Sequence, residues 1–151
     1  MLEWHWLGKL NTFELRKESK QMVDADHSNF APEGWHTVTP RIVAQDASQL
    51  VEFLRQVFGA TGDYRTDRPS VIQIGDSMIM ISNTEISNTE IRNATAAFLY
   101  VYVNDADATY QRALNAGARS LEKPFDTPYG DRRCMVEDKW GNTWQIATQL
   151  R

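Results

Sequence analysis

The sequence contains few of the residues that build disulfide frameworks and metal centres. Cys134 is the only cysteine among 151 residues, so an intramolecular disulfide cannot form. A chain without disulfides is typical of a reducing compartment, and we expect this protein in the cytoplasm. The three histidines, at positions 5, 27 and 36, are too scattered in the sequence to form a metal-binding motif.

Long apolar runs and a strong charge of one sign are also absent. The longest apolar runs, such as residues 94–103, are too short and too interrupted to span a bilayer. The N-terminal segment lacks the cationic start and long apolar run of a secretory signal. The formal net charge of −4 gives no electrostatic reason to expect nucleic acid. We therefore expect neither a membrane nor a nucleic acid as a partner.

Within these limits the composition is that of an ordinary globular domain. The chain is 42% hydrophobic and 24% charged, and it is long enough to bury one core. We interpret residues 35–151 as a single domain and residues 1–34 as an N-terminal arm, partly helical or flexible. The tryptophans of the arm, Trp4 and Trp6, need a surface to cover, either on the domain or on a second copy of the chain.

One pattern occurs twice, as "RIVAQDASQLVEFLRQVFGATG" and as "LYVYVNDADATYQRALNAGARS". In each copy, β-branched or aromatic residues lead to an aspartate, about three helical turns follow, and a Gly-Ala pair ends the segment. We expect Asp46 to cap the first helix, and either Asp105 or Asp107 to cap the second. Gly59 is expected to end the first helix in the left-handed conformation.

Strand-like segments follow both helices. The segment "SVIQIGDSMIMIS" predicts two strands joined by a turn at Gly75, and "RRCMVEDKWGNTWQIAT" predicts two strands joined at residues 138–142. Each half, at about 35–84 and 94–151, is therefore predicted as a strand, a helix and about three strands. Because neither half can bury its sheet alone, we predict an α+β fold in which tandem βαβββ repeats form a curved mixed sheet around a cleft.

Together these segments resemble one known family. "TPRIVAQDASQLVEFLRQVFGA", "IGDSMIMIS", "YVYVNDADATYQRALNAGA" and "YGDRRCMVEDKWGNTWQIAT" are similar, in this order, to the glyoxalase/bleomycin-resistance/dioxygenase superfamily, also called the vicinal oxygen chelate fold. The resemblance covers about residues 35–148, and the closing pattern looks most like the small bleomycin-resistance-like branch. It implies the fold predicted above, a small-molecule ligand in the cleft and a homodimer.

In this family, metal-dependent members place His, Glu or Gln ligands on the first and last strands of each half. The resemblance assigns Thr39 and Phe98 to the first-strand positions, and Met80 and Gln145 to the last-strand positions. Of these only Gln145 is a plausible ligand, because Thr and Met bind hard divalent ions poorly and Phe does not bind them. We therefore predict no metal ion and no cofactor.

Strand alternation predicts which side chains line the cleft instead. The wall is apolar and aromatic with a few polar groups, as in small-molecule pockets. The predicted pocket residues are Thr39, Arg41, Met78, Met80, Phe98, Tyr100, Tyr102 and Gln145. Arg132, or its neighbour Arg133, is expected at the cleft mouth, facing an anionic or oxygen-rich ligand. For Phe98, Met78 and Met80 we favour burial in the core, whereas for Tyr100 and Tyr102 core and pocket remain equal alternatives.

The sequence leaves three functions open. The first is a metal-independent small-molecule-binding protein, with antibiotic sequestration as one form of that role. The second is a lyase, isomerase or dioxygenase of the same fold, with an atypical metal site or one that the substrate completes. The third is a dimeric interaction domain whose cleft is filled by its own side chains. Catalytic residues are not assigned.

Overall fold

The computed structural model describes residues 30–84 and 95–151, and the chain divides after Val38 into two units. The second unit, Thr39–Arg151, contains both predicted halves and all the predicted pocket residues. Most of the predicted N-terminal arm and the polar connector between the halves lie outside the described residues.

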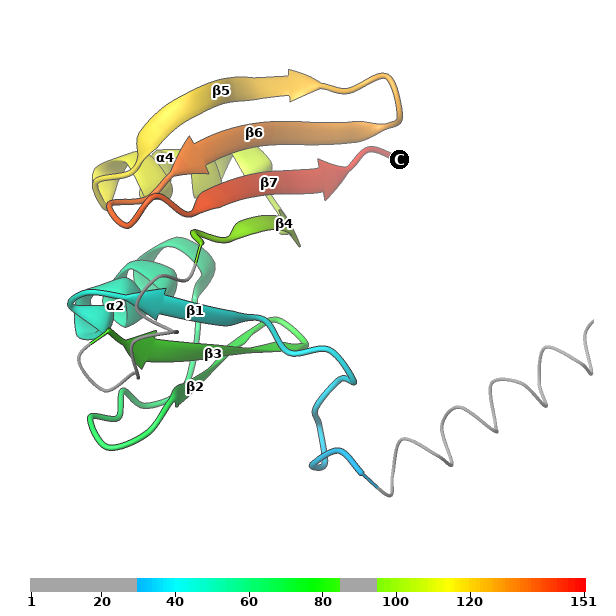
Figure 1. The fold of residues 1–151 in the computed structure, drawn as a ribbon. Helices are drawn as coiled ribbons and strands as arrows, with labels where there is room; N and C mark the ends of the chain where they lie inside the picture. The colour runs from blue at the N-terminus through cyan, green and yellow to red at the C-terminus, as the bar shows by residue number, and fades with distance from the viewer. Residues whose placement is uncertain (1–29, 85–94) are drawn as a thin grey trace, which may run out of the picture. The chain divides into compact units, whose positions relative to one another are not determined.

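The first half forms a three-stranded sheet and one helix. The strand order is β1-β3-β2, with β1 parallel to β3 and β2 antiparallel to β3 (Figure 1). The strand expected directly after the helix is reduced to a single bridge between Thr61 and Gln73. The elements are β1 (Arg41–Ala44), α2 (Ala47–Phe58), β2 (Ser70–Ile74) and β3 (Ser77–Asn83).

The second half repeats this arrangement with a complete set of strands. Its four-stranded sheet has the order β4-β7-β6-β5, in which only β4 and β7 run parallel. The first and last strands of both halves pair alike: Arg41 lies beside Met80, and Tyr100 lies beside Gln145. The α+β fold of two βαβββ modules is therefore confirmed. The elements are β4 (Phe98–Tyr102), α4 (Ala106–Asn115), β5 (Arg119–Asp126), β6 (Asp131–Glu137) and β7 (Thr143–Gln149).

The two helix starts differ although the sequence pattern is the same. The Asp105 side chain accepts a hydrogen bond from the backbone N–H of Ala108 at 2.9 Å, as a cap should. Asp46 instead adopts a left-handed conformation with φ 55°, and its side chain makes no capping bond, so that prediction is wrong. The turn is closed by a backbone hydrogen bond from Gln49 to the Asp46 carbonyl. Gly59 ends α2 with φ 64°, as expected.

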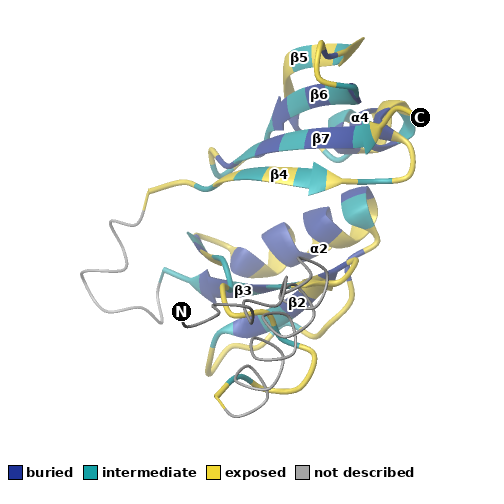
Figure 2. Ribbon diagram, turned by 90° about the vertical axis from the view of Figure 1, so that its right-hand side faces the viewer, coloured by how far each residue is buried: buried dark blue, intermediate teal, exposed yellow. Residues whose placement is uncertain are grey.

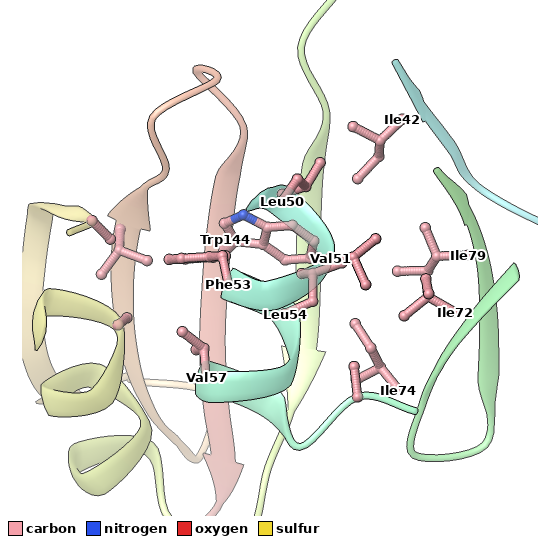
Figure 3. Close-up of a cluster of buried hydrophobic side chains, with 14 of the residues drawn as sticks. Ile42, Leu50, Val51, Phe53, Leu54, Val57, Ile72, Ile74, Ile79 and Trp144 are labelled. Carbon is pink, nitrogen blue, oxygen red and sulfur yellow. The ribbon is translucent and has the colours of Figure 1, made fainter. Parts of the chain in front are cut away.

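Helix α2 is buried on two sides, which explains its broad apolar surface. Figure 3 shows Val51 and Leu54 pointing toward the isoleucines of the first sheet, while Phe53 and Val57 point away from them. On that second side the ring of Phe58 packs against Trp144 of β7, with ring centroids 5.2 Å apart. A helix buried on only one side would need a narrower apolar stripe.

Contacts made by α2 and by the turn before it join the two halves. The indole N–H of Trp140 donates to the Gln45 carbonyl at 2.6 Å, and Arg112 of α4 donates to the carbonyl of Val57 at 3.2 Å. The halves therefore meet through their helices and through the β6–β7 hairpin. The sheet faces that are turned away from the helices are not used in these contacts, and Figure 2 shows exposed positions alternating along β4.

Candidate ligand-binding face

The second sheet buries one face beneath α4 and leaves the other uncovered. Along β4, Leu99 and Val101 pack toward the core, whereas Phe98, Tyr100 and Tyr102 are 64%, 38% and 65% exposed. We call the face that carries these three aromatic residues the open face. Because side chains alternate along strands, Gln145 of β7 and Asp131, Arg133 and Met135 of β6 belong to it as well. Phe98 is therefore not a core residue of the described chain.

The predicted residues of the first half share one sheet face, the one turned away from α2. Arg41 lies beside Met80, and Met78 stands two residues earlier on the same side of β3. The guanidinium Nε of Arg41 donates to the hydroxyl of Ser82 at 3.1 Å. Both methionines are half-buried, and Thr39 precedes β1. We call this group the first-sheet face.

Arg132, one of the two arginines expected at the cleft mouth, does not belong to either group. It shares a side of β6 with the buried Cys134, beneath α4. Its guanidinium forms an ion pair with Asp107 of α4 at 2.9 Å and a second one with Asp126 at 3.2 Å. These two carboxylates raise the pKa of Arg132. They also hold its guanidinium group away from the open face. The neighbouring arginine, Arg133, is the one that reaches the open face.

Asp131 joins the two tyrosines of β4 into one cluster. Its Oδ2 accepts a hydrogen bond from the hydroxyl of Tyr100 at 2.6 Å and one from the hydroxyl of Tyr102 at 3.0 Å. The two rings are tilted by 53°, with centroids 5.3 Å apart. The backbone N–H of Asp131 donates to the hydroxyl of Thr127, which fixes the start of β6. Asp131 is 4% exposed, so it lies beneath the rings.

The sequence permits this cluster because a small residue lies between its members. Tyr102 is on β4 and Asp131 is on β6, so the tyrosine side chain must cross β7 to reach the carboxylate. The β7 residue paired with Tyr102 is Ala147, which is buried although it lies on the open face. A longer side chain at this position would occupy the space over which the tyrosine lies.

Arg133 holds a second group on the same face. It donates to the Glu122 carboxylate at 2.8 Å and to the hydroxyl of Tyr129 at 2.7 Å. Its guanidinium carbon also lies 5.3 Å from the centre of the Phe125 ring, within the range of a cation–π contact. The charge of Arg133 is thus balanced by Glu122, and this part of the open face is electrically neutral.

The tyrosine hydroxyls of the cluster are hydrogen-bond donors and not bases. Burial, together with hydrogen bonds to Asp131 and Tyr129, raises the pKa of Tyr100 above its ordinary value. The hydrogen bond to Asp131, together with desolvation, raises the pKa of Tyr102 in the same direction. Both phenols therefore stay protonated near neutral pH, and neither can take a proton from a substrate there.

The positions that the sequence resemblance assigned to metal ligands carry Thr39, Met80, Phe98 and Gln145. In residues 30–84 and 95–151, no three His, Cys, Asp or Glu side chains gather to hold an ion. Gln145 has Tyr100 as its β4 neighbour and Met135 as its β6 neighbour, so both flanking side chains are poor ligands for a hard cation. The donor set at these positions does not fit a divalent ion.

A groove lies on the opposite side of the second half, between α4 and β5. It has a volume of about 650 Å³ and is lined in part by Tyr110, Lys123, Pro124 and the ion pair of Asp107 with Arg132. None of the predicted pocket residues except Arg132 contributes to it. This groove is the natural comparison site for any test of the open face.

Sequence reasoning did not identify Asp131 or Tyr129 as site residues, and it left Arg132 and Arg133 as alternatives. The strand register carried the necessary signal: Met135 pairs with Gln145, so the odd-numbered residues of β6 share the face of Gln145. Applying that alternation would have selected Arg133 and Asp131 in place of Arg132.

Known proteins are similar to this chain in sequence. Residues 35–146 match the family described as the Glyoxalase/Bleomycin resistance protein/Dioxygenase superfamily, and the chain belongs to this family. An uncharacterized protein of Mycobacterium bovis is 25% identical over 127 residues, covering 76% of this chain and 84% of its own. An uncharacterized protein of Mycobacterium tuberculosis H37Rv is also 25% identical, with 76% and 75% covered.

Solved structures show the same fold. TioX from Micromonospora sp. ML1 is 24% identical with a TM-score of 0.60, covering 75% of this chain and 99% of its own. A glyoxalase/bleomycin resistance protein/dioxygenase family enzyme from Burkholderia phytofirmans PsJN is 21% identical with a TM-score of 0.63, covering 73% and 95%. At these identities the likeness establishes the fold alone. Among the described helices, none has the length and apolar character to cross a membrane.

Proposed function

We propose that this protein binds a small organic molecule on the open face without the help of a metal ion. The observation that carries the proposal is the exposure of Phe98, Tyr100 and Tyr102 on one strand face. A folded domain gains nothing from placing three large aromatic residues in water, and such groupings mark ligand or partner sites. The adjacent Asp131 and Gln145 supply the few polar groups that orient a ligand in an otherwise apolar site.

A second copy of the chain completes the pocket in this proposal. One sheet face can contact only one side of a ligand, whereas a pocket buries most of the ligand surface. The first-sheet face, with Arg41, Met78 and Met80, is the second surface of the pocket in this proposal. In a symmetric dimer, the first-sheet face of each copy lies opposite the open face of the other copy. We expect light scattering to give twice the 17.3 kDa chain mass. A monomer under conditions where ligand binds would contradict this step.

The proposal extends to metal independence, because the donor set described above does not fit a divalent ion. We expect metal analysis after exposure to nickel, zinc, manganese and iron to find less than one ion per chain. Ligand affinity should be the same in EDTA as in buffer with added metal. A stoichiometric ion whose loss abolishes binding would favour the family's metal-dependent chemistry instead.

Antibiotic sequestration in the cytoplasm is the role we propose for this binding. It is supported by the family description, which includes bleomycin resistance proteins. Expression of the chain in a sensitive bacterium should then raise the minimum inhibitory concentration of the bound compound. The Tyr102→Ala variant, expressed to the same level, should not. Equal resistance from the unchanged chain and from Tyr102→Ala would argue against sequestration through the open face.

A thermal-shift screen against antibiotics and aromatic metabolites tests binding directly. A ligand that binds the folded protein only must raise its melting temperature. We expect Tyr102→Ala to remove the shift, because Tyr102 is exposed and its loss removes ligand contact without opening the core. Lys123→Ala in the α4–β5 groove is the matched control and should keep the shift. Unchanged melting temperatures across the library would favour an interaction domain.

A further inference from the structure

We propose that Arg41 of each copy forms an ion pair with Asp131 of a second copy, and that this pair docks the two copies. The inference rests on the proposed function, because it names the contact that holds the second copy against the open face. Three features carry it: two opposite charges without partners, the position of α2 between them, and the side chains that surround them.

The carboxylate of Asp131 has no cationic partner among the described residues. Asp131 is almost fully buried, and its side chain accepts hydrogen bonds from the neutral hydroxyls of Tyr100 and Tyr102. Both of these bonds go to Oδ2, while Oδ1 accepts none from the described residues. Because buried charges in proteins are normally paired, one cation is missing at this position.

Arg41 is the opposite case on the first-sheet face. It is exposed, and its guanidinium Nε donates to the neutral hydroxyl of Ser82 at 3.1 Å. The strands of the first sheet contain no other charged residue. The ion pairs within the described part of the chain use the arginines Arg55, Arg119, Arg132 and Arg133. The first-sheet face therefore has one unbalanced positive charge.

The open face has one unbalanced negative charge. Its other acidic groups already have cations: Glu122 pairs with Arg133 at 2.8 Å, and Glu137 pairs with Arg119 at 3.0 Å. These two pairs cancel, which leaves the charge of Asp131. Opposite charges on two surfaces favour their association with each other and oppose the association of either surface with its own kind.

Arg41 and Asp131 do not meet within one chain, because α2 lies between their sheets. Leu54 of α2 points toward the isoleucines of the first sheet (Figure 3), while the ring of Phe58 packs against Trp144 of β7 on the other side. Arg41 lies on the face of the first sheet that is turned away from α2. An ion pair between Arg41 and Asp131 must therefore join two copies.

The side chains around the two charges are complementary as well. Met78 and Met80 lie beside Arg41 on the first-sheet face. The open face presents the ring of Tyr102, which is 65% exposed, and thioether groups pack favourably against aromatic rings. Because Asp131 is already buried in the single chain, assembly removes little further water from it, and its attraction to Arg41 favours the dimer.

Charge reversal in a mixture of two variants tests the pair. Arg41→Glu brings two carboxylates together in each contact and Asp131→Lys brings two cations together, so each variant alone should dimerise about a hundredfold more weakly. Mixed in equal amounts, the two variants should form a dimer in light scattering, because every contact then joins opposite charges again. Lys123→Gln removes a cation from the α4–β5 groove and should leave the dimer unchanged.

Neutral variants test the same pair with less disturbance of the buried position. Asp131→Asn keeps an oxygen that can accept from both tyrosine hydroxyls, and Arg41→Gln changes an exposed residue. We expect each variant to raise the dissociation constant of the dimer about tenfold in analytical ultracentrifugation. The double variant should dimerise at most about threefold more weakly than either single variant, because the second change removes nothing that the first has left. Fully additive effects would contradict a direct pair.

The results separate this inference from the proposed function. If the unchanged chain is a dimer and Arg41→Glu is also a dimer of equal strength, the pair is overturned and ligand binding on the open face is not affected. Folded single variants that stay monomeric when mixed also overturn the pair. If Asp131→Lys does not fold, the neutral variants decide. A monomeric unchanged chain overturns the inference together with the dimer of the proposed function.

Discussion

The carboxylate of Asp138 accepts a hydrogen bond from the indole N–H of Trp144 at 2.9 Å, and both residues are buried. The same carboxylate accepts from the backbone N–H groups of Trp140 and Asn142 and from the Asn142 amide. One side chain thus closes the β6–β7 turn and orients the tryptophan that α2 packs against. Asp138, Asn142 and Trp144 of the closing sequence pattern therefore have a structural role.

Replacing Asp138 by alanine should therefore destabilise the fold strongly. The change leaves buried N–H groups of Trp144 and Asn142 without acceptors, and we expect a loss of about 3 kcal/mol in the free energy of unfolding. Urea denaturation followed by tryptophan fluorescence measures it. Asp76→Ala removes an exposed carboxylate bonded to Ser77 and should change the free energy by less than about 0.5 kcal/mol. Equal effects of the two changes would contradict the structural role of Asp138.

Gly62 is required where the chain returns beside β2. It has φ 114°, and a Cβ at this position would collide with the backbone carbonyl of Val71, which cannot move without disturbing the sheet. We expect Gly62→Ala to cost about 2 kcal/mol or more. Gly75→Ala is the matched control, because that glycine has φ 57° but open space around it. Its cost should be near 1 kcal/mol. If Gly62→Ala lowered the free energy of unfolding less than Gly75→Ala, the chain at Gly62 would not lie as close to β2 as the structure shows.

The thiol of Cys134 should be unreactive in the folded protein. Burial, aided by the negative charges of Asp107 and Glu122, raises the pKa of its thiol to about 12. The reactive thiolate is therefore scarce at pH 8, and solvent does not reach the sulfur. A disulfide reagent should label the chain completely in concentrated urea and only at the rate of unfolding in buffer. Rapid labelling of the native protein at pH 8 would show that β6 is open to solvent.

The tyrosine cluster predicts a loss of stability in alkali. The folded protein holds the pKa of Tyr100 and Tyr102 above the ordinary value of about 10, so it keeps protons that the unfolded chain releases. The stabilisation is fully present below pH 10 and falls as the pH rises further. Urea midpoints at pH 8 and pH 11 measure the fall. The double variant Tyr100→Phe, Tyr102→Phe, which cannot ionise here, should lose less. An equal fall in both proteins would mean that the phenols are not held by Asp131.

The sequence predicts the elements well because their signals are local. The helix end at Gly59, the cap at Asp105 and the burial of Cys134 each depend on a few neighbouring residues. Asp46 shows the limit of local reasoning. Its pattern is that of a cap, but the chain enters α2 through a left-handed residue that no local pattern marks. The reduction of the strand after α2 to a single bridge is likewise not marked by any local pattern.

The candidate site is harder to predict because it depends on register and on tertiary contacts. Arg132 and Arg133 are adjacent, and one step along β6 decides between an ion pair under α4 and the open face. The link from Tyr102 to Asp131 further requires the small side chain of Ala147 on the strand between them. Neither fact is visible until the strand order is known.

The most direct test of the central claim is a crystal structure of the full chain with the tightest compound from the thermal-shift screen. We expect the compound to lie against the rings of Tyr100 and Tyr102, within contact of Asp131, with the first-sheet face of a second copy covering it. Density for the compound in the groove beside Lys123, with the open face filled by protein side chains, would contradict the claim.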